Sequence, residues 1–217
     1  MKKIAIIGSH GLYASYGGWD QLVNNLAENK SDDIEYIIFN SSCIGCVKDP
    51  PFGVSVKKLI FRADGWQGFF FDFYSLILSY FNSDAVLLLG AQGMPIVPFL
   101  SLFKTQNVII NIGGVEWERP KYNRVIKKYF KYCFKLCLKK SRKIILDNAH
   151  YKMFIPANSE CSSFVIPYGG TIDSSLEVNS ELSEKHPFLK KEYFLSISRS
   201  LEDNKIDELC SIFQDSK

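Results

Sequence analysis

The sequence predicts an α/β fold in which a doubly wound parallel sheet is covered by helices on both faces. Short runs rich in Ile, Val, Leu and Phe show little polar alternation, which is typical of strands buried on both faces. Longer segments with helical periodicity separate these runs, and that alternation is the pattern of a parallel sheet. Hydrophobic residues make up 47% of the 217 residues, which is enough for a sizeable core.

The expected elements follow one another regularly along the chain. Strands are expected at residues 3–8, 34–40, 54–61, 85–90, 107–112, 143–147, 163–167 and 193–198. Helices are expected between them at residues 19–30, 68–81, 95–103, 122–140 and 148–157. The polar stretch 171–191 interrupts this pattern and is typical of a linker.

The pattern divides the chain into a first Rossmann-like domain (1–175), a linker (176–191) and the first strand and helix of an incomplete second domain (192–217). One strand and one helix do not bury each other's apolar faces as an independent domain. We therefore expect that the chain continues in the intact protein, that its last segment packs on the first domain, or that a second chain completes the fold.

Positive charge is concentrated on one segment. The formal net charge is only +3, but residues 119–143 contain 11 basic residues and no acidic ones. The sequence has no run of about 18 apolar residues, the length needed to span a bilayer. We expect a cytoplasmic protein that contacts the inner face of the cell membrane peripherally.

The helix expected at residues 122–140 is amphipathic. Four lysines, Lys127, Lys128, Lys131 and Lys135, lie largely off a broad apolar face made by Val125, Ile126, Tyr129, Phe130, Cys133, Phe134, Cys137 and Leu138. Residues 121–140 therefore suit an anionic membrane surface, and equally a solvated basic face. Nucleic acid is not an expected partner, because no recognition module is evident.

The loop at residues 8–18 follows the first expected strand and leads into a helix. Its glycines let the backbone turn tightly, and a helix N-terminus offers unpaired N–H groups to an anion. The spacing is not that of the GxGxxG dinucleotide fingerprint. His10 lies in this loop and is a candidate catalytic base. The alternative is an ordinary connection with an exposed histidine.

A second candidate segment, residues 111–119, follows another buried strand. The carboxylate of Glu116 suits hydroxyl groups, Trp117 offers an apolar face, and Arg119 adds a positive charge. The alternative is a helix start, where the dipole favours acidic residues. No metal site is expected, because the three histidines are isolated and the CxxC pair Cys43 and Cys46 has no second pair to complete it.

Four motifs occur in order along the chain: KIAIIGSHGLYASYGGWDQLVNNLA, INIGGVEWERPKYNRVIKKYFK, VIPYGG and YFLSISRSLEDNKI. They resemble motifs of the rhamnosyltransferase-like branch of glycosyltransferase family 4. That branch typically has a strand followed by G-[IL]-P-A-x-Y-G-G-F-E, then N-x-D-G-x-E-W-x-R-x-K-W, I-P-Y-G-A and Y-F-L-x-V-G-R-x-x-P-E-N-N. The four motifs cover nearly the whole chain.

The resemblance implies a GT-B fold of two Rossmann-like domains, of which this chain would be the N-terminal, acceptor-side domain and the start of the donor-side domain. It implies transfer of rhamnose or a related sugar from a nucleotide-sugar to a lipid-linked saccharide in cell-surface polysaccharide biosynthesis. No cofactor or metal is implied, because basic side chains and helix N-termini offset the charge of the leaving diphosphate.

The resemblance also implies roles for single residues. Gly17 and Gly18 match the glycine pair of the first motif, and Glu116, Trp117 and Arg119 match the E-W-x-R part of the second, all on the acceptor side. The residues that match the donor-diphosphate motif are Arg199, Asp203 and Asn204. Glu116 joins His10 as a candidate catalytic group.

Three departures from the family pattern bear on activity. Gly113 stands where the family has an aspartate, and Ser198 stands where it has the glycine before the arginine. The chain also has no counterpart of two donor-site glutamates spaced seven residues apart. We therefore expect this chain alone to be inactive, and a non-catalytic remnant or acceptor-binding module is the alternative function.

Overall fold

The computed structural model describes residues 1–45, 49–169, 180–198 and 204–214. The chain forms two compact units, which are described separately. The first comprises residues 1–118 and 122–168, and the second comprises residues 119–121 and 169–217. The first unit holds the whole sheet that the structure describes.

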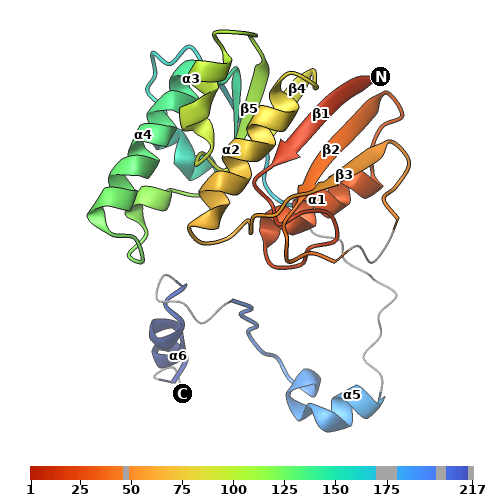
Figure 1. The fold of residues 1–217 in the computed structure, drawn as a ribbon. Coiled ribbons are helices and arrows are strands. Elements are labelled where there is room, and N and C mark those ends of the chain that lie inside the picture. The colour runs from red at the N-terminus through yellow and green to blue at the C-terminus, as the bar shows by residue number, and fades with distance from the viewer. Residues whose placement is uncertain (46–48, 170–179, 199–203, 215–217) are drawn as a thin grey trace. The chain divides into compact units, whose positions relative to one another are not determined.

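The sheet has seven strands, all parallel, in the order β3-β2-β1-β4-β5-β6-β7 (Figure 1). The strands are β1 (Lys2–Ile7), β2 (Ile34–Asn40), β3 (Val54–Lys58), β4 (Ala85–Leu89), β5 (Asn107–Ile112), β6 (Lys143–Leu146) and β7 (Ser162–Val165). Each lies at one of the first seven expected runs, and the predicted doubly wound, Rossmann-like fold class is confirmed.

The strand order reverses at β1. The chain runs from β1 outward to β2 and β3, then returns across the sheet to place β4 on the other side of β1. In sheets of this kind, ligands bind beyond the carboxyl ends of the strands at such a switch point. The loops that follow β1 and β4 therefore flank the position where a ligand site is expected.

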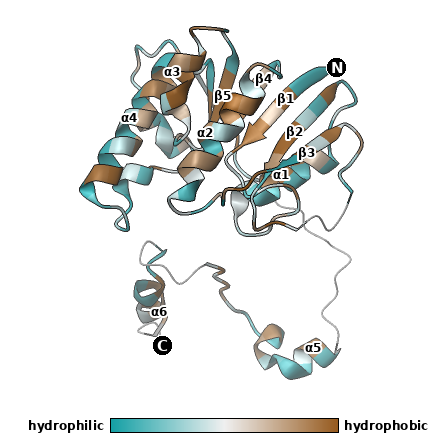
Figure 2. Cartoon of the chain, viewed as in Figure 1, coloured by the Kyte–Doolittle hydropathy of each residue, from teal (hydrophilic) through white to brown (hydrophobic). Residues whose placement is uncertain are grey.

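Two apolar clusters cover the two faces of the sheet. Along β1, Ile6 packs into the cluster with α1 (Gly18–Glu28), whereas its neighbours Ala5 and Ile7 pack into the cluster on the other face. The cluster that contains Ala5 and Ile7 also includes side chains from α2 (Gln67–Tyr80), α3 (Val97–Leu100) and α4 (Arg124–Lys140). Burial on both faces explains why the central strand β4 is apolar throughout and why β1 is apolar from Ile4 onward, after its two exposed lysines (Figure 2).

The helices differ from the expected bounds where a capping side chain or a proline determines where a helix begins or ends. The side chain of Asn123 accepts a hydrogen bond from the backbone N–H of Ile126 at 2.9 Å, so α4 begins at Arg124. The expected helix 95–103 divides into η1 (Met94–Ile96) and the short α3. The expected helix 148–157 is a 3-10 turn, η3 (Ala149–Phe154), which stops before Pro156.

The second unit differs from expectation in two ways. The expected linker contains the short helix α5 (Ser180–Lys185) and the 3-10 turn η4 (Pro187–Lys190), and α6 (Ile206–Gln214) follows further on. The strand predicted at 193–198 is wrong: these residues form no strand, and their apolar side chains, such as Phe194 and Ile197, are exposed. A strand needs a neighbour to pair with, and the described part of this unit supplies none.

Asp72 is a buried carboxyl group in the middle of α2. Its side chain is 1% exposed, and neither oxygen has a hydrogen-bond partner among the described residues. Burial raises the pKa of Asp72 to about 7, although the side chain of Gln92 opposes the shift. Because the folded-state pKa is raised, the unfolded chain releases this proton at lower pH than the folded one. Asp72 therefore lowers stability progressively as pH rises from about 4 to about 7.

We predict that Asp72→Asn raises the free energy of unfolding at pH 8, because a neutral amide replaces a carboxylate that burial disfavours. The gain is on the order of 4 kcal/mol at most, about three pH units at about 1.4 kcal/mol each. Urea unfolding at pH 4 and pH 8 measures it, with exposed Asp32→Asn as the control. An equal effect at both pH values would contradict the prediction.

Candidate functional site

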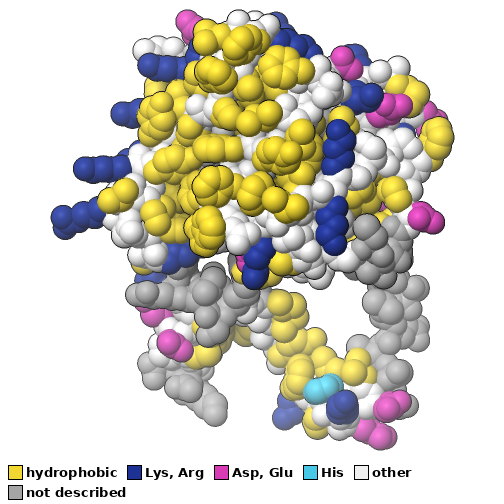
Figure 3. Space-filling view, viewed as in Figure 1, with side chains coloured by type: hydrophobic (Ala, Val, Ile, Leu, Met, Phe, Trp, Pro, Cys, Tyr) yellow, Lys and Arg dark blue, Asp and Glu magenta, His cyan; other side chains and the backbone are white. Residues whose placement is uncertain are grey.

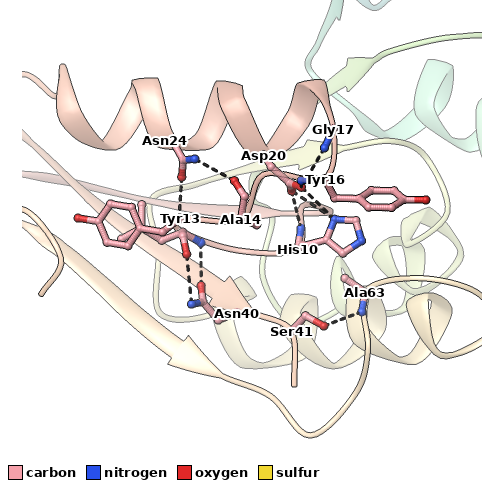
Figure 4. A network of polar contacts seen from close by, with 11 residues as sticks. His10, Tyr13, Ala14, Tyr16, Gly17, Asp20, Asn24, Asn40, Ser41 and Ala63 are labelled. Atoms are coloured by element: carbon pink, nitrogen blue, oxygen red, sulfur yellow. Dashed lines mark hydrogen bonds and ion pairs between the residues drawn. The ribbon is translucent and has the colours of Figure 1, made fainter. Parts of the chain in front are cut away.

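The carboxylate of Asp20, in the first turn of α1, organises the loop between β1 and α1 (Figure 4). It accepts hydrogen bonds from the backbone N–H of His10 at 2.8 Å, of Tyr16 at 3.0 Å and of Gly17 at 3.2 Å. The side chain is 1% exposed. Burial alone would raise the pKa of Asp20, but the hydrogen bonds from His10 and Tyr16 hold it below its ordinary value. Asp20 is therefore an ionised anchor.

Two asparagines fix the rest of this loop. Asn40, at the end of β2, accepts from the backbone N–H of Leu12 at 2.8 Å, and Asn24 on α1 accepts from that of Tyr13 at 2.7 Å. Gly11 adopts a φ of +123°, and a Cβ there would lie 2.2 Å from Oδ1 of Asn40. Only glycine fits this close approach, so the loop has a single well-defined course.

His10 forms a dyad with Asp20. Its Nδ1 lies 3.1 Å from Oδ2 of the carboxylate, so Nδ1 carries the donated proton and Nε2 is left for other chemistry. The hydrogen bond to Asp20 raises the pKa of His10 above the ordinary 6.5, although burial opposes the shift. The side chain is 24% exposed and can therefore be reached. An oriented imidazole with a raised pKa has the properties of a general base.

The first-turn N–H groups are less available to an anion than the sequence indicates. The Asp20 carboxylate already supplies a negative charge at the N-terminus of α1 and takes the N–H of Gly17. A Cβ at Gly17 or Gly18 would meet no atom within 4 Å. The glycine pair thus borders open space, and packing does not require it.

A pocket opens at the carboxyl ends of β4 and β5, beside the switch point. It is a shallow, partly open pocket, and the figure of about 340 Å³ for its empty space includes space that belongs to open solvent. The residues that line it are Trp19, Gly90, Ala91, Ile112, Gly113, Gly114, Glu116, Trp117, Phe130 and Phe134. Two indoles, two phenyl rings and one carboxylate around a small volume suit the apolar faces and hydroxyl groups of a sugar.

Trp19 closes one side of this pocket by lying against two glycines. A Cβ on Gly113 would come within 2.9 Å of its indole ring, and a Cβ on Gly90 within 3.0 Å. The first turn of α1, which follows the loop after β1, thus contacts the loop after β5 through Trp19. The aspartate that the family pattern has at position 113 would collide with this indole.

The other predicted site residues are placed unevenly. Glu116 and Trp117 lie in the 3-10 turn η2 (Glu116–Glu118), and Trp117 packs on Phe134 with ring centroids 4.9 Å apart. Arg119 follows this turn and is not among the pocket-lining residues.

The residues assigned to the donor diphosphate lie mostly outside the part of the chain that the structure describes. Arg199 and Asp203 lie outside the described residues, and Asn204 is exposed. Among the described residues, no group of three or more His, Cys, Asp or Glu side chains could hold a metal ion.

Sequence reasoning missed Trp19 and Asp20. The available signal for Asp20 was an acidic residue three positions after a glycine at a helix start, which is the spacing of a side chain that caps its own helix. For Trp19 it was a large aromatic residue at an otherwise polar helix start, together with glycines just after two buried strands.

The face of the first unit that carries α2 and α3 is strongly apolar (Figure 3). Exposed side chains recur on α2 and its flanks at helical spacing, and more lie in and after α3. They are Trp66, Phe70, Tyr74, Ile77, Phe81, Phe99, Leu102 and Phe103. On neighbouring α4, Lys128, Lys131 and Lys135 are exposed, as is Val125, which was expected on the packed face. We call these residues of α2, α3 and α4 the apolar-basic face.

None of the described helices is both long and apolar enough to cross a membrane.

Fold and site together define an α/β protein of the Rossmann-like class with an aromatic pocket at its switch point. A family model described as a domain of unknown function (DUF1972) matches residues 86–171, which include most of the pocket. No curated protein matches the sequence.

Two solved structures are similar to this chain. Sucrose-phosphate synthase from Thermosynechococcus elongatus superposes with a TM-score of 0.60 at 12% identity, over 78% of this chain and 49% of that one. UDP-N-acetylglucosamine 2-epimerase from Rickettsia bellii gives a TM-score of 0.42 at 14% identity, over 76% of this chain and 44% of that one. This chain thus spans about half the length of each, and the first likeness shows a shared fold.

We predict that His10 titrates above pH 6.5 and that Asp20→Asn lowers its pKa, because the charge and the hydrogen bond that favour the imidazolium are both lost. NMR titration of the ring signals measures both values. Asp32→Asn, which removes an exposed carboxylate, should leave the titration unchanged. An unaltered pKa in a folded Asp20→Asn variant would show that the dyad does not set the charge of His10.

Proposed function

We propose that the chain supplies the acceptor-binding domain of a sugar transferase. The observation that carries this proposal is the pocket lined by Trp19, Trp117 and Glu116 at the carboxyl ends of β4 and β5. Indole faces suit the C–H surface of a sugar ring, and a carboxylate suits its hydroxyl groups. The fold shared with sucrose-phosphate synthase supports the expectation of one domain of a GT-B architecture.

His10 is the group that we assign as general base. Trp19 lines the pocket and Asp20 orients His10, so consecutive residues of α1 join the two parts of the site. In the transfer, the acceptor oxygen bonds to the anomeric carbon while the bond from that carbon to the nucleoside diphosphate breaks. The diphosphate leaves with the electron pair, and the hydroxyl proton passes to Nε2 of His10. Glu116 then serves to bind hydroxyl groups.

The finer assignments rest on the sequence motifs. We propose a nucleotide-sugar donor, with rhamnose or a related sugar, and a lipid-linked saccharide acceptor of cell-surface polysaccharide synthesis. We also propose that the reaction needs no metal, since charged side chains of a donor site can offset the diphosphate charge. In that scheme Arg199, Asp203 and Asn204 belong to the donor side, and Arg119 to the acceptor side.

A binding module without transfer activity is the alternative, and Gly113 in place of an acidic residue favours it. The two functions differ in what happens at His10. If a bound saccharide presents a hydroxyl to Nε2, saccharide binding should shift the NMR signals of the His10 ring. If the domain only binds, these signals should stay unchanged at saturation.

We predict that Glu116→Gln weakens binding of a water-soluble, short-chain analogue of a lipid-linked saccharide about tenfold, because a charge-assisted hydrogen bond is lost. Quenching of tryptophan fluorescence measures the affinity. Glu118→Gln, in the same turn but outside the pocket lining, is the matched control and should bind normally. Equal affinities for both variants would remove the pocket from the proposal.

We predict that the unaltered chain transfers no sugar by itself. When it is mixed with dTDP-rhamnose or UDP-sugars and a lipid-linked acceptor, mass spectrometry should detect no product. The described residues form one sheet-containing unit, whereas transfer needs both substrates held together, an effect worth roughly 7–11 kcal/mol. Turnover near 1 per second, an ordinary enzyme rate, would contradict this expectation.

We propose that the apolar-basic face meets an anionic membrane on the cytoplasmic side, where a lipid-linked acceptor would be found. Aromatic and aliphatic side chains of α2 and α3 would enter the interface, and lysines of α4 would meet the headgroups. Each lysine contributes about 1 kcal/mol near such a surface.

We predict that the triple variant Lys128→Glu, Lys131→Glu, Lys135→Glu no longer sediments with phosphatidylserine-containing vesicles, whereas the unaltered chain does so in a salt-sensitive way. The matched control reverses three exposed lysines elsewhere, Lys2, Lys57 and Lys58, and keeps the same net charge. If both triple variants sediment equally, α4 has only a solvated basic face.

A further inference from the structure

Three polar side chains gather beyond the carboxyl ends of β5, β6 and β7, outside both the dyad and the pocket lining. Asn111 is the last residue but one of β5, Asp147 directly follows β6, and Tyr168 lies three residues after β7. Burial raises the pKa of Tyr168, the Asp147 charge adds to this, and the donors of Trp19 and Asn111 oppose it.

The register of the sheet explains why these side chains share one face. Asn111 pairs with Leu89 on one side and with Ile145 on the other. Paired residues of parallel strands point the same way, and Leu89 packs with α1, so Asn111 points to the α1 face. Asp147 lies two residues beyond Ile145 and therefore shares this face. It also stands beside Gly113, because Ile112 pairs with Leu146.

Two oxygens in this cluster are buried without a partner among the described residues. They are Oδ1 of Asn111 and Oδ1 of Asp147. Asn111 is only 5% exposed, so its amide oxygen has lost its hydrogen bonds to water, and no described residue donates a hydrogen bond in their place. A buried acceptor that stays unpaired destabilises the fold, and a pair of them at the ends of adjacent strands is seldom kept without a use.

We propose that Asn111, Asp147 and Tyr168 form a hydroxyl-binding subsite, in which the two unpaired oxygens accept hydrogen bonds from neighbouring hydroxyls of a pyranose ring beside the Trp19 indole. This subsite rests on the proposed function and extends it, because Trp19 belongs both to the pocket wall and to the surroundings of Tyr168.

The chemistry of the cluster selects this ligand class. The unpaired atoms are acceptors, so the ligand must bring donors. A phosphate or carboxylate would place negative charge beside Asp147 and is disfavoured. A pyranose offers hydroxyl donors on adjacent carbons and an apolar C–H face for the indole, which matches acceptors on adjacent strands next to a tryptophan.

The experiment measures equilibrium binding of methyl pyranosides and of their monodeoxy analogues by NMR saturation transfer and calorimetry, with no donor present. Asp147→Asn should weaken binding of one fully hydroxylated pyranoside about tenfold, and should not weaken its analogue that lacks the contacted hydroxyl. Tyr168→Phe, which removes only the hydroxyl of a half-exposed side chain, should weaken it several-fold. Asp32→Asn, at an exposed carboxylate far along the sheet, should bind as the unaltered chain does.

Each outcome bears separately on the subsite and on the proposed function. Equal losses for the pyranoside and its deoxy analogue, or none, would overturn the subsite and leave transfer untouched. A crystal structure at saturating sugar in which waters still fill the positions beside Asn111 and Asp147 would overturn it too. A third outcome separates the two proposals. If Asp147→Asn selectively weakens pyranoside binding while the His10 signals do not respond to sugar, the subsite is supported and the proposed transfer reaction is contradicted.

Discussion

The buried carboxylate of Asp20 is the group on which the arrangement of the site depends. Its burial is costly, and hydrogen bonds from His10, Tyr16 and Gly17 offset that cost only while the loop keeps its course. A further contact of the same carboxylate, with Nδ1 of the His10 ring, fixes which ring nitrogen carries a proton. The backbone hydrogen bonds also hold the first turn of α1, and therefore the indole of Trp19, against the carboxyl ends of β4 and β5. One ionised group thus couples acid–base chemistry to the shape of the pocket.

The sequence predicted the sheet well because its signal is local. In β1, Ala5, Ile6 and Ile7 are all apolar, and packing on both faces is the usual reason for such a run. The same reasoning failed for residues 193–198, since an apolar run indicates a strand only where another strand lies beside it. At 148–157 the apolar spacing is helical, and a 3-10 turn forms between Asn148, which caps it, and Pro156.

The site was predicted in part, and the missing part is the long-range one. His10, Glu116 and Trp117 were singled out because residues of these types at strand ends suggest chemistry, and each lies where ligands bind in this fold. An acid in the first turn of a helix usually signals nothing more than the dipole, so Asp20 drew no attention. The contact between Trp19 and Gly113 joins residues 94 positions apart, which no local pattern reveals. Arg199 and Asp203 fall outside the described residues.

The packing of the indole of Trp19 on Gly113 has a consequence for how this protein can diverge. A side chain at position 113 would need volume that the Trp19 indole fills. A smaller residue must therefore replace Trp19 before, or at the same time as, a larger residue replaces Gly113. Lineages that carry an acidic group at 113 should therefore bear a smaller ring or an aliphatic residue at 19. Single exchanges between the two states would pass through a clashing or a hollow intermediate. The two positions therefore have to change together, and a new shape of this pocket wall would have to arise as a paired substitution.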